Sequence, residues 1–149
     1  MKITICSSAS FYEHVVQIQS QLEDMGYEVL IPYTAEKMKA AGTFQLDGFK
    51  PPVGDVKWKQ ELMNGHFDKV EQGDVCLVVN DDKSSVKNYI GGNVLMEMTL
   101  AYRQHKPIVI LNEIPMDSSF AEEIIGVDPI VLHGKLEDLP QALTISGQK

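Results

Sequence analysis

A glycine pair and a helical carboxylate in the segment 88–102 are the strongest candidates for chemistry in the sequence. Gly91 and Gly92 stand where a helix is expected to begin, and glycines let backbone N–H groups approach a ligand closely. The positive end of the helix dipole would favour an anion such as a phosphate. Asn88 precedes the turn, and Asn93 could cap the helix. A loop that only needs a positive φ at one glycine would explain the pair equally well.

Glu97 follows the expected helix start by about one turn and is the most informative residue of this segment. Its sequence neighbours are mostly apolar, including Met96 and Met98, and a carboxylate in such surroundings is costly unless it is paired or used. Glu97 could therefore act as a nucleophile or as a general acid–base. The alternative, that it lies on the solvent-facing side of its helix, is slightly favoured by position alone.

Further candidates lie in the helix expected before the third strand and at the ends of expected strands. His66 could exchange protons near neutral pH, with Asp68 two residues further on, although a lone histidine is more often a helix-surface residue. Ser7 and Ser8 could donate to a phosphate or a sugar hydroxyl, but serines are also common turn residues. Asn80, at the end of the third strand, is well placed to touch a ligand.

Known cofactor and metal motifs are absent from the sequence. It contains no P-loop, no GxSxG elbow, no GxGxxG dinucleotide fingerprint and no clustered His/Cys metal site. Cys6 and Cys76 lie in apolar runs without metal-ligand spacing, and we interpret them as buried thiols in a reducing cytoplasm. We therefore expect neither a metal nor another cofactor.

Strand-like and helix-like stretches alternate along the chain. Capping boxes are expected at Ser10 with Glu13 and at Ser119 with Glu122, and Asp55 is expected to cap the third helix. The buried stripe of the first helix would consist of Phe11, Val15, Ile18, Leu22 and Met25. Strands are expected at 2–6, 27–31, 74–79, 107–111 and 129–132, and helices at 10–25, 34–41, 55–70, 93–105, 119–126 and 136–143.

This alternation predicts a single-domain α/β fold: a doubly wound, flavodoxin- or Rossmann-like sheet of five parallel strands with helices on both faces. The domain would span residues 1–145, followed by a tail at 146–149. Ligands of such sheets bind beyond the carboxyl ends of the strands, where strand order reverses. That rule brings together the segments 7–10, 80–92 and 112–118 and the loop after Ile31. The irregular loop 42–54 is long enough to suggest a functional role.

Composition and charge limit the classes of partner. The 149 residues are 44% hydrophobic and 23% charged, as expected for one globular domain. A net charge of −8 disfavours nucleic acid polymers and anionic membranes, without excluding a small anionic ligand. The sequence has no apolar run of the ~20 residues that a membrane helix needs and no signal-peptide pattern, so we expect a cytoplasmic protein.

From the first strand to about Asn112, the sequence resembles the nucleoside 2-deoxyribosyltransferase-like superfamily, which includes the deoxynucleoside 5′-monophosphate N-glycosidases. The resemblance is strongest over 74–112. This stretch contains, in the order typical of the family, an apolar strand, a polar loop, the turn 91–97, the pair Ala101-Tyr102 and a final Lys-Pro-Ile. The resemblance implies that Glu97 is the nucleophile that takes the deoxyribosyl group from a base and forms a covalent glycosyl intermediate.

The sequence departs from the family pattern at three places. His66, with Asp68 nearby, stands where the family usually has an aspartate on the helix before the third strand. Gly91 stands where an acidic residue commonly precedes the catalytic glutamate. Cys6 or Ser7 replaces an aromatic residue that often ends the first strand. By resemblance, His66 or Asp68 would assist the departing base.

We therefore expect a nucleoside- or nucleotide-binding protein that cleaves or transfers the N-glycosidic bond of a (deoxy)nucleoside or its 5′-monophosphate. The backbone at 91–93, with Ser7 and Ser8, would hold sugar and phosphate. A non-catalytic nucleotide-binding or sensing module is the alternative, and a flavodoxin-like interaction domain ranks last. A homodimer is also expected, from the resemblance and from the apolar residues spread around one helix: Met96, Met98, Leu100 and Tyr102.

Overall fold

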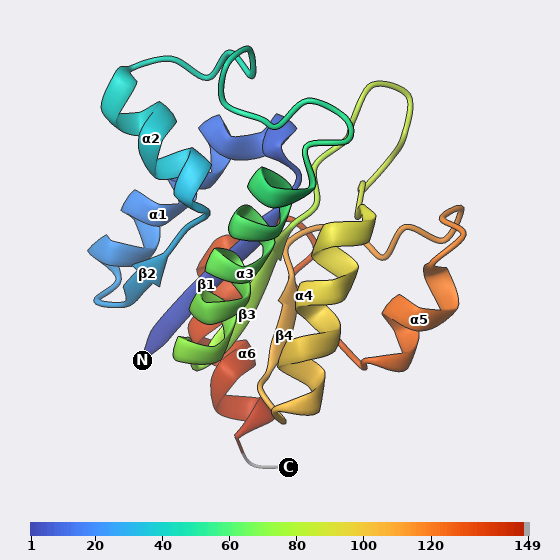
Figure 1. Cartoon of the computed structure of the whole chain (residues 1–149). Helices are drawn as coiled ribbons and strands as arrows, with labels where there is room; N and C mark the ends of the chain where they lie inside the picture. The colour runs from blue at the N-terminus through green and yellow to red at the C-terminus, as the bar shows by residue number, and fades with distance from the viewer. Residues whose placement is uncertain (148–149) are drawn as a thin grey trace.

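The computed structural model describes residues 1–147 as a five-stranded sheet between two layers of helices (Figure 1). Sheet and helices alternate along the chain as the sequence predicts. The elements are β1 (Lys2–Ser7), the 3₁₀ turn η1 (Ala9–Phe11), α1 (Tyr12–Asp24), β2 (Glu28–Leu30), α2 (Tyr33–Ala41), α3 (Val56–Gln72), β3 (Val75–Val79), α4 (Gly92–Arg103), β4 (Ile108–Ile110), α5 (Ala121–Gly126), β5 (Ile130–Val131), the 3₁₀ turn η2 (Leu136–Asp138) and α6 (Leu139–Ser146).

All five strands are parallel and follow the order β2-β1-β3-β4-β5. This is the doubly wound order in which winding reverses between β1 and β3, and it confirms the predicted fold class. Ser7 pairs with Val79 in register. The carboxyl ends of β1 and β3 therefore finish side by side, at the place where such folds bind ligands.

Each face of the sheet carries its own apolar core. α1, η2 and α6 cover one face, and α3, α4 and α5 cover the other. β3 is buried along its whole length, which explains why its sequence is a continuous apolar run. Cys6 and Cys76 are free, buried and on the face that α3 and α4 cover, so their prediction as buried thiols is confirmed.

The first helix differs from its expected form at both ends. Ser8, not Ser10, supplies the cap: its side chain accepts a hydrogen bond from the backbone N–H of Ser10, and η1 precedes the helix. The predicted Ser10–Glu13 capping box is therefore wrong. Met25 is also wrongly predicted as buried, because α1 ends at Asp24 and leaves Met25 42% exposed beyond the last turn.

Two further caps were predicted on the wrong residues, and one was correct. α4 starts at Gly92, so Asn93 lies inside the helix and Gly91, which has no side chain, occupies the cap position. α5 begins after Phe120 without a side-chain cap, so the expected box of Ser119 and Glu122 does not form. Asp55 does cap α3, accepting from the backbone N–H of Trp58 at 3.1 Å.

The connection between α2 and α3 contains no helix or strand over 42–54, as predicted. Figure 1 shows it crossing the carboxyl end of the sheet, above η1 and the start of α3. At the other end of the chain, α6 continues to Ser146, one residue into the predicted tail, and Gln148 and Lys149 lie outside the described residues. Within residues 1–147, no helix has the length and apolar character to cross a membrane.

Candidate active site

The site lies where α3 and α4 pack together above the carboxyl ends of β1 and β3 (Figure 1). α1 follows β1 onto one face of the sheet, whereas α4 follows β3 onto the other. A crevice between diverging chain segments is the consequence of this reversal. Side chains from β1, α3 and α4 point into the same place and supply its chemistry.

Glu97 lies on the buried side of α4, together with Val94, Met98 and Ala101. It is only 8% exposed, so the alternative of a solvent-facing glutamate is excluded. Burial raises the pKa of its carboxyl group to about 8, although a hydrogen bond from Cys6 and the positive charge of Lys59 act in the opposite direction. Its Oε2 atom is buried and has no hydrogen-bond partner among residues 1–147.

His66 reaches Glu97 from α3. Its Nε2 atom lies 3.9 Å from Glu97 Oε2, and the ring is buried. Burial, assisted by the charge of Lys69, lowers the pKa of His66 to about 4. At neutral pH the histidine is therefore uncharged and the glutamate largely protonated, so their approach is not an ion pair. His66 Nδ1 also lacks a hydrogen-bond partner within the described part of the chain.

Cys6 completes the group from the end of β1. Its Sγ atom lies 3.5 Å from His66 Nε2 and 3.7 Å from the Sγ of Cys76 on the neighbouring strand. The contact with Cys76, followed by burial, raises the pKa of the Cys6 thiol well above its ordinary value. A protonated thiol can donate to the Glu97 carboxylate, which makes Cys6 a partner of Glu97 rather than a free nucleophile.

Two further residues interact electrostatically with Glu97 and were not predicted as site residues, Tyr12 and Lys59. The pKa of the Tyr12 phenol is raised, first by burial and then by the negative charge of Glu97. The predicted stripe of the first helix skipped Tyr12, so its position gave no signal. Lys59 lies two turns before His66 on α3, a spacing of seven residues that places both on one side of the helix; this spacing could have revealed it.

The start of α4 offers backbone donors beside this group. Gly91 has φ −89° and Gly92 has no positive φ either, so neither glycine is required by a left-handed conformation. At Gly91 a Cβ atom would lie 2.9 Å from the Tyr89 hydroxyl, whereas at Gly92 it would meet nothing. Gly92 and Asn93 are exposed. The first turn of this twelve-residue helix is therefore open to solvent, and its N–H groups, which have no partner within the helix, are available to an anion.

Four other predicted site residues do not reach the buried group. Asp68 is exposed, because two residues along a helix turn a side chain away from the face of His66. Ser7 Oγ donates to the Ser8 carbonyl, and Ser8 caps η1. Asn88 adopts φ +52°, and its backbone N–H donates to Asp82 Oδ1 at 3.0 Å.

Asn80 is fully buried and ties two loops together rather than facing a cavity. Its Nδ2 donates to the Glu113 carbonyl at 2.9 Å, and its Oδ1 accepts from the Asn112 N–H at 2.9 Å. Asn112 Nδ2 in turn donates to Asp81 Oδ1 at 3.3 Å, and Asp81 Oδ2 lies 2.6 Å from His14 Nδ1. This network holds the loops after β3 and β4 around the rim of the site.

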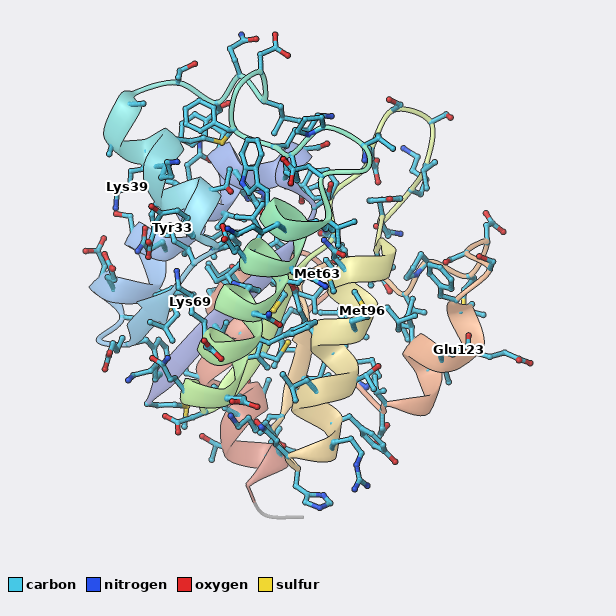
Figure 2. All side chains as sticks on the ribbon, viewed as in Figure 1. Tyr33, Lys39, Met63, Lys69, Met96 and Glu123 are labelled. Carbon is cyan, nitrogen blue, oxygen red and sulfur yellow. The ribbon has the colours of Figure 1, made fainter. Side chains whose placement is uncertain are left out.

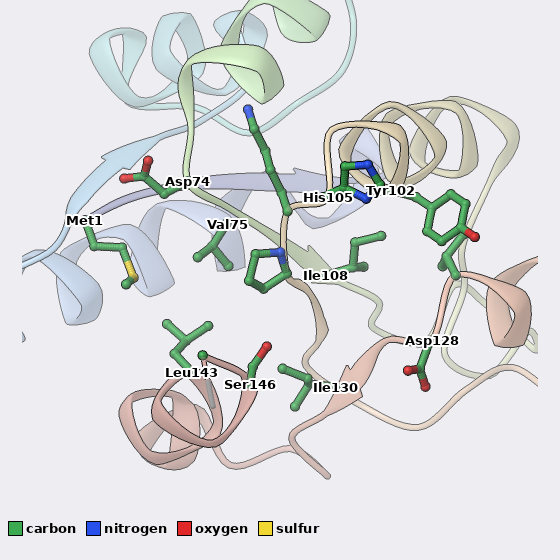
Figure 3. A pocket seen from close by; sticks show the side chains of 14 residues that line it. Met1, Asp74, Val75, Tyr102, His105, Ile108, Asp128, Ile130, Leu143 and Ser146 are labelled. Atoms are coloured by element: carbon green, nitrogen blue, oxygen red, sulfur yellow. The ribbon is translucent and has the colours of Figure 1, made fainter. Parts of the chain in front are cut away.

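A large cavity of about 620 Å³ lies at the opposite end of the sheet, where the strands begin (Figure 3). Its walls are mostly apolar and include Val75, Ile108 and Ile130. Lys106, the cation in its wall, is engaged already, since its Nζ donates to the carbonyls of Val70 and Glu71 at the end of α3. We assign the candidate active site to the Glu97 region because the buried titratable groups gather there.

Comparison with known proteins supports the same class of fold. No family model and no curated protein matches the chain. The structure of the CMP N-glycosidase BcmB from Clostridium botulinum matches with a TM-score of 0.51 at 14% sequence identity, covering 98% of this chain and 99% of that one. A 2-deoxyribosyltransferase from Bacillus psychrosaccharolyticus matches with a TM-score of 0.50 at 19% identity, covering 74% of this chain and 71% of that one. The chain therefore has the nucleoside 2-deoxyribosyltransferase-like fold, as the sequence resemblance predicted.

Proposed function

We propose that the protein cleaves or transfers the N-glycosidic bond of a (deoxy)nucleoside or its 5′-monophosphate, with Glu97 as the nucleophile. One observation carries this proposal: Glu97 is a buried carboxyl group with an unpartnered oxygen, and it lies beside His66 at the carboxyl ends of β1 and β3. The two structural neighbours, a CMP N-glycosidase and a 2-deoxyribosyltransferase, support nucleosides and nucleotides as the substrate class.

The chemistry requires the ionised form of Glu97. A carboxylate oxygen forms a bond to C1′ of the sugar while the C1′–N bond breaks, and the bonding electron pair leaves with the base. Water, or the nitrogen of an acceptor base, then displaces Glu97 from C1′ and restores the carboxylate. A buried carboxylate is poorly solvated, which makes its attack on an electron-poor carbon more favourable than that of an exposed one.

Neighbouring side chains would assist the departing base and bind the rest of the substrate. His66 and Tyr12 both keep a proton at neutral pH, because His66 is an uncharged imidazole with one N–H and the pKa of the phenol is raised. Either could donate a hydrogen bond to the base. The exposed start of α4 at Gly92 and Asn93, together with Lys59 on α3, would hold a 5′-phosphate.

Release of free base tests this proposal. The purified protein is incubated, with EDTA present, with a panel of deoxynucleosides, ribonucleosides and their 5′-monophosphates, and free base is measured by chromatography. We expect release from at least one substrate and its loss in Glu97→Gln. Asp68→Asn is the matched control, since it neutralises an exposed carboxylate on α3 that points away from the buried group and should keep the wild-type rate.

Two results would contradict the proposal. Full activity of Glu97→Gln would exclude Glu97 as the nucleophile. Thermal stabilisation by a nucleotide without any base release would favour the alternative of a non-catalytic binding module, because a ligand that binds only the folded state raises its stability whether or not it reacts.

We also propose that the protein forms a homodimer through the outer side of α4. Of the apolar residues around this helix, Met98 is buried, whereas Met96 and Tyr102 are 40% and 50% exposed. Figure 2 shows Met96 on α4 and Met63 on the neighbouring helix α3. Light scattering at working concentration should give twice the monomer mass, and a monomer mass would contradict this proposal.

A further inference from the structure

Cys6, His66 and Glu97 form the only group of three or more potential metal-binding side chains in residues 1–147. One ligand atom from each, a sulfur, an imidazole nitrogen and a carboxylate oxygen, lies within 4.8 Å of both others. They come from β1, α3 and α4, and this origin from separate elements is why no local spacing in the sequence reveals them.

From this arrangement we propose that Cys6, His66 and Glu97 bind a zinc-class divalent cation as three protein ligands with a fourth position open. Thiolate, imidazole and carboxylate are the ligands that zinc takes in proteins, and three protein ligands plus one exchangeable position is the usual arrangement of a reactive zinc site. Cobalt(II), which prefers similar ligands, is a suitable spectroscopic substitute.

The distances already approach those of a tetrahedral site. With Zn–S of about 2.3 Å and Zn–N of about 2.05 Å, a tetrahedral angle puts sulfur and nitrogen about 3.5 Å apart, and nitrogen and oxygen about 3.3 Å apart. Cys6 Sγ and His66 Nε2 are 3.5 Å apart, and His66 Nε2 and Glu97 Oε2 are 3.9 Å apart. A closure of about 0.6 Å by the Glu97 side chain would bring the nitrogen–oxygen pair to its tetrahedral distance, and the sulfur–oxygen pair lies within 4.8 Å.

An independent observation points to a missing ligand. Glu97 Oε2, which faces the group, is buried without a hydrogen-bond partner in the described part of the chain. A buried polar atom without a partner is costly, and coordination to a cation would satisfy it. On binding, the Cys6 thiol and any protonated Glu97 release their protons to solvent, leaving a thiolate and a carboxylate on the metal.

Metal binding would also switch off the proposed reaction, and this consequence alone rests on the proposed function. Glu97 cannot hold a cation and attack C1′ with the same oxygen. Zinc should therefore inhibit base release in competition with the substrate, and EDTA should restore the rate. The binding itself is independent of any turnover.

A cobalt titration tests the site without substrate. The full chain is stripped with EDTA, exchanged into chelator-free buffer and titrated with cobalt(II) chloride. We expect a thiolate-to-cobalt charge-transfer band in the near ultraviolet that saturates at one equivalent and is displaced by zinc. Cys6→Ser should abolish the band, and His66→Asn and Glu97→Gln should weaken binding by more than about 100-fold.

Cys76→Ser provides the matched control. Its sulfur is 3.7 Å from that of Cys6 but lies outside the three-residue group, so this variant should keep the band. No band in the wild-type protein, or a band that survives Cys6→Ser and disappears in Cys76→Ser, would overturn the proposal. If Cys6→Ser does not fold, Cys76→Ser decides, because Cys6 is then the only cysteine of the chain. A thiolate-to-cobalt band in this variant must come from Cys6, and its absence would overturn the proposal. Base release measured in EDTA is unaffected by either outcome, so the two proposals fail separately.

Discussion

The two most distinctive regions of the molecule lie where the strands begin, which we call the amino edge of the sheet, and where they finish, which we call the carboxyl edge. These two regions differ in what they offer a ligand. The amino edge has volume: a cavity of about 620 Å³ whose wall includes Asp74 and Lys106. Both of these charged groups have partners, since Asp74 accepts from the Lys2 backbone N–H and Lys106 donates to two carbonyls. The carboxyl edge holds Glu97, a buried carboxyl group whose Oε2 atom has no hydrogen-bond partner among the described residues.

This difference is why we place the proposed reaction at the desolvated, incompletely hydrogen-bonded groups and not at the larger cavity. Burial moves the pKa of Glu97 to about 8 and that of His66 to about 4. Shifts of this kind in opposite directions within one site are typical of acid–base and nucleophilic chemistry. A charged group that already has its hydrogen-bond partners, such as Asp74 or Lys106 in the wall of the large cavity, has no comparable reactivity.

The largest difference in activity is expected between a substitution at the carboxyl edge and one at the amino edge. Glu97→Gln should reduce kcat/KM for base release by at least about 10³-fold, since it removes the attacking atom while keeping the shape. Ile130→Phe, which narrows the amino-edge cavity, should leave the rate within about twofold because that cavity takes no part in the reaction. Steady-state kinetics on the best substrate of the panel measures both. An equal loss in the two variants would remove the distinction between the edges.

Removing the assisting histidine should have a smaller effect. His66→Asn keeps a hydrogen-bond donor of similar size but cannot donate in the same geometry, so kcat should fall by about 100-fold. His14→Asn, which loses the contact with Asp81 at the rim, is the control and should change kcat by less than about threefold. The prediction fails if the rim variant loses more activity than the buried one.

The pH dependence should follow the ionisation of Glu97. In the proposed mechanism the ionised form of Glu97 is the nucleophile, and burial raises the pKa of this group to about 8. The value of kcat/KM should therefore rise about tenfold per unit between pH 5 and 7 and level off above about 8. His66, with a pKa near 4, adds no further limb in that range. Profiles measured in EDTA on the same substrate check this, and a rate that falls between pH 6 and 8 would contradict the role of Glu97.

The same carboxyl group should destabilise the folded protein at high pH. Between its ordinary pKa of 4.5 and its folded value of about 8, folded Glu97 keeps a proton that the unfolded chain releases, so the free energy of unfolding falls as pH rises. Above pH 8, Glu97→Gln should therefore be more stable than wild type by about 2–4 kcal/mol, with little difference near pH 4.5. Urea unfolding of both proteins at pH 5 and 9 measures the change.

Two glycines give the smallest and most local comparison. At Gly73, near the amino edge, a Cβ atom would lie within clashing distance of the buried Thr4 side chain, which donates to the Lys69 carbonyl. Gly73→Ala should destabilise the fold by about 2 kcal/mol. Gly65 in α3 has nothing within 4 Å of its Cβ position, so Gly65→Ala should stabilise by about 0.5–1 kcal/mol. Opposite signs in thermal unfolding confirm the packing, and equal signs contradict it.

The sequence predicted the fold more completely than the site because its strongest signals are local. The apolar run of β3 and the Asp55 cap each depend on a few consecutive residues. Glu97 was found by its apolar neighbours and by resemblance, but its burial depends on how α3 covers α4. That packing is a tertiary property, which position in one helix does not determine.

The partners of Glu97 show the same limit. Cys6 was predicted as a buried thiol, without any sign that it would contact His66, sixty residues later in the chain. Tyr12 escaped notice because it lies off the buried stripe of the first helix and is only partly buried, so its interaction with Glu97 depends on tertiary packing. Asn80 was chosen for its strand-end position, yet its hydrogen bonds are all internal. Contacts between distant elements therefore account for most of what the sequence left open.

The most direct test of the central claim is a search for the covalent intermediate on Glu97. The protein is mixed with a 2′-fluoro-arabino analogue of its best substrate, which slows hydrolysis of the glycosyl ester, then quenched in acid and digested for mass spectrometry. We expect one added sugar on the peptide that contains Glu97, and none in Glu97→Gln. Base release from the wild-type protein with the sugar on another residue, or at an equal rate in Glu97→Gln, would contradict it.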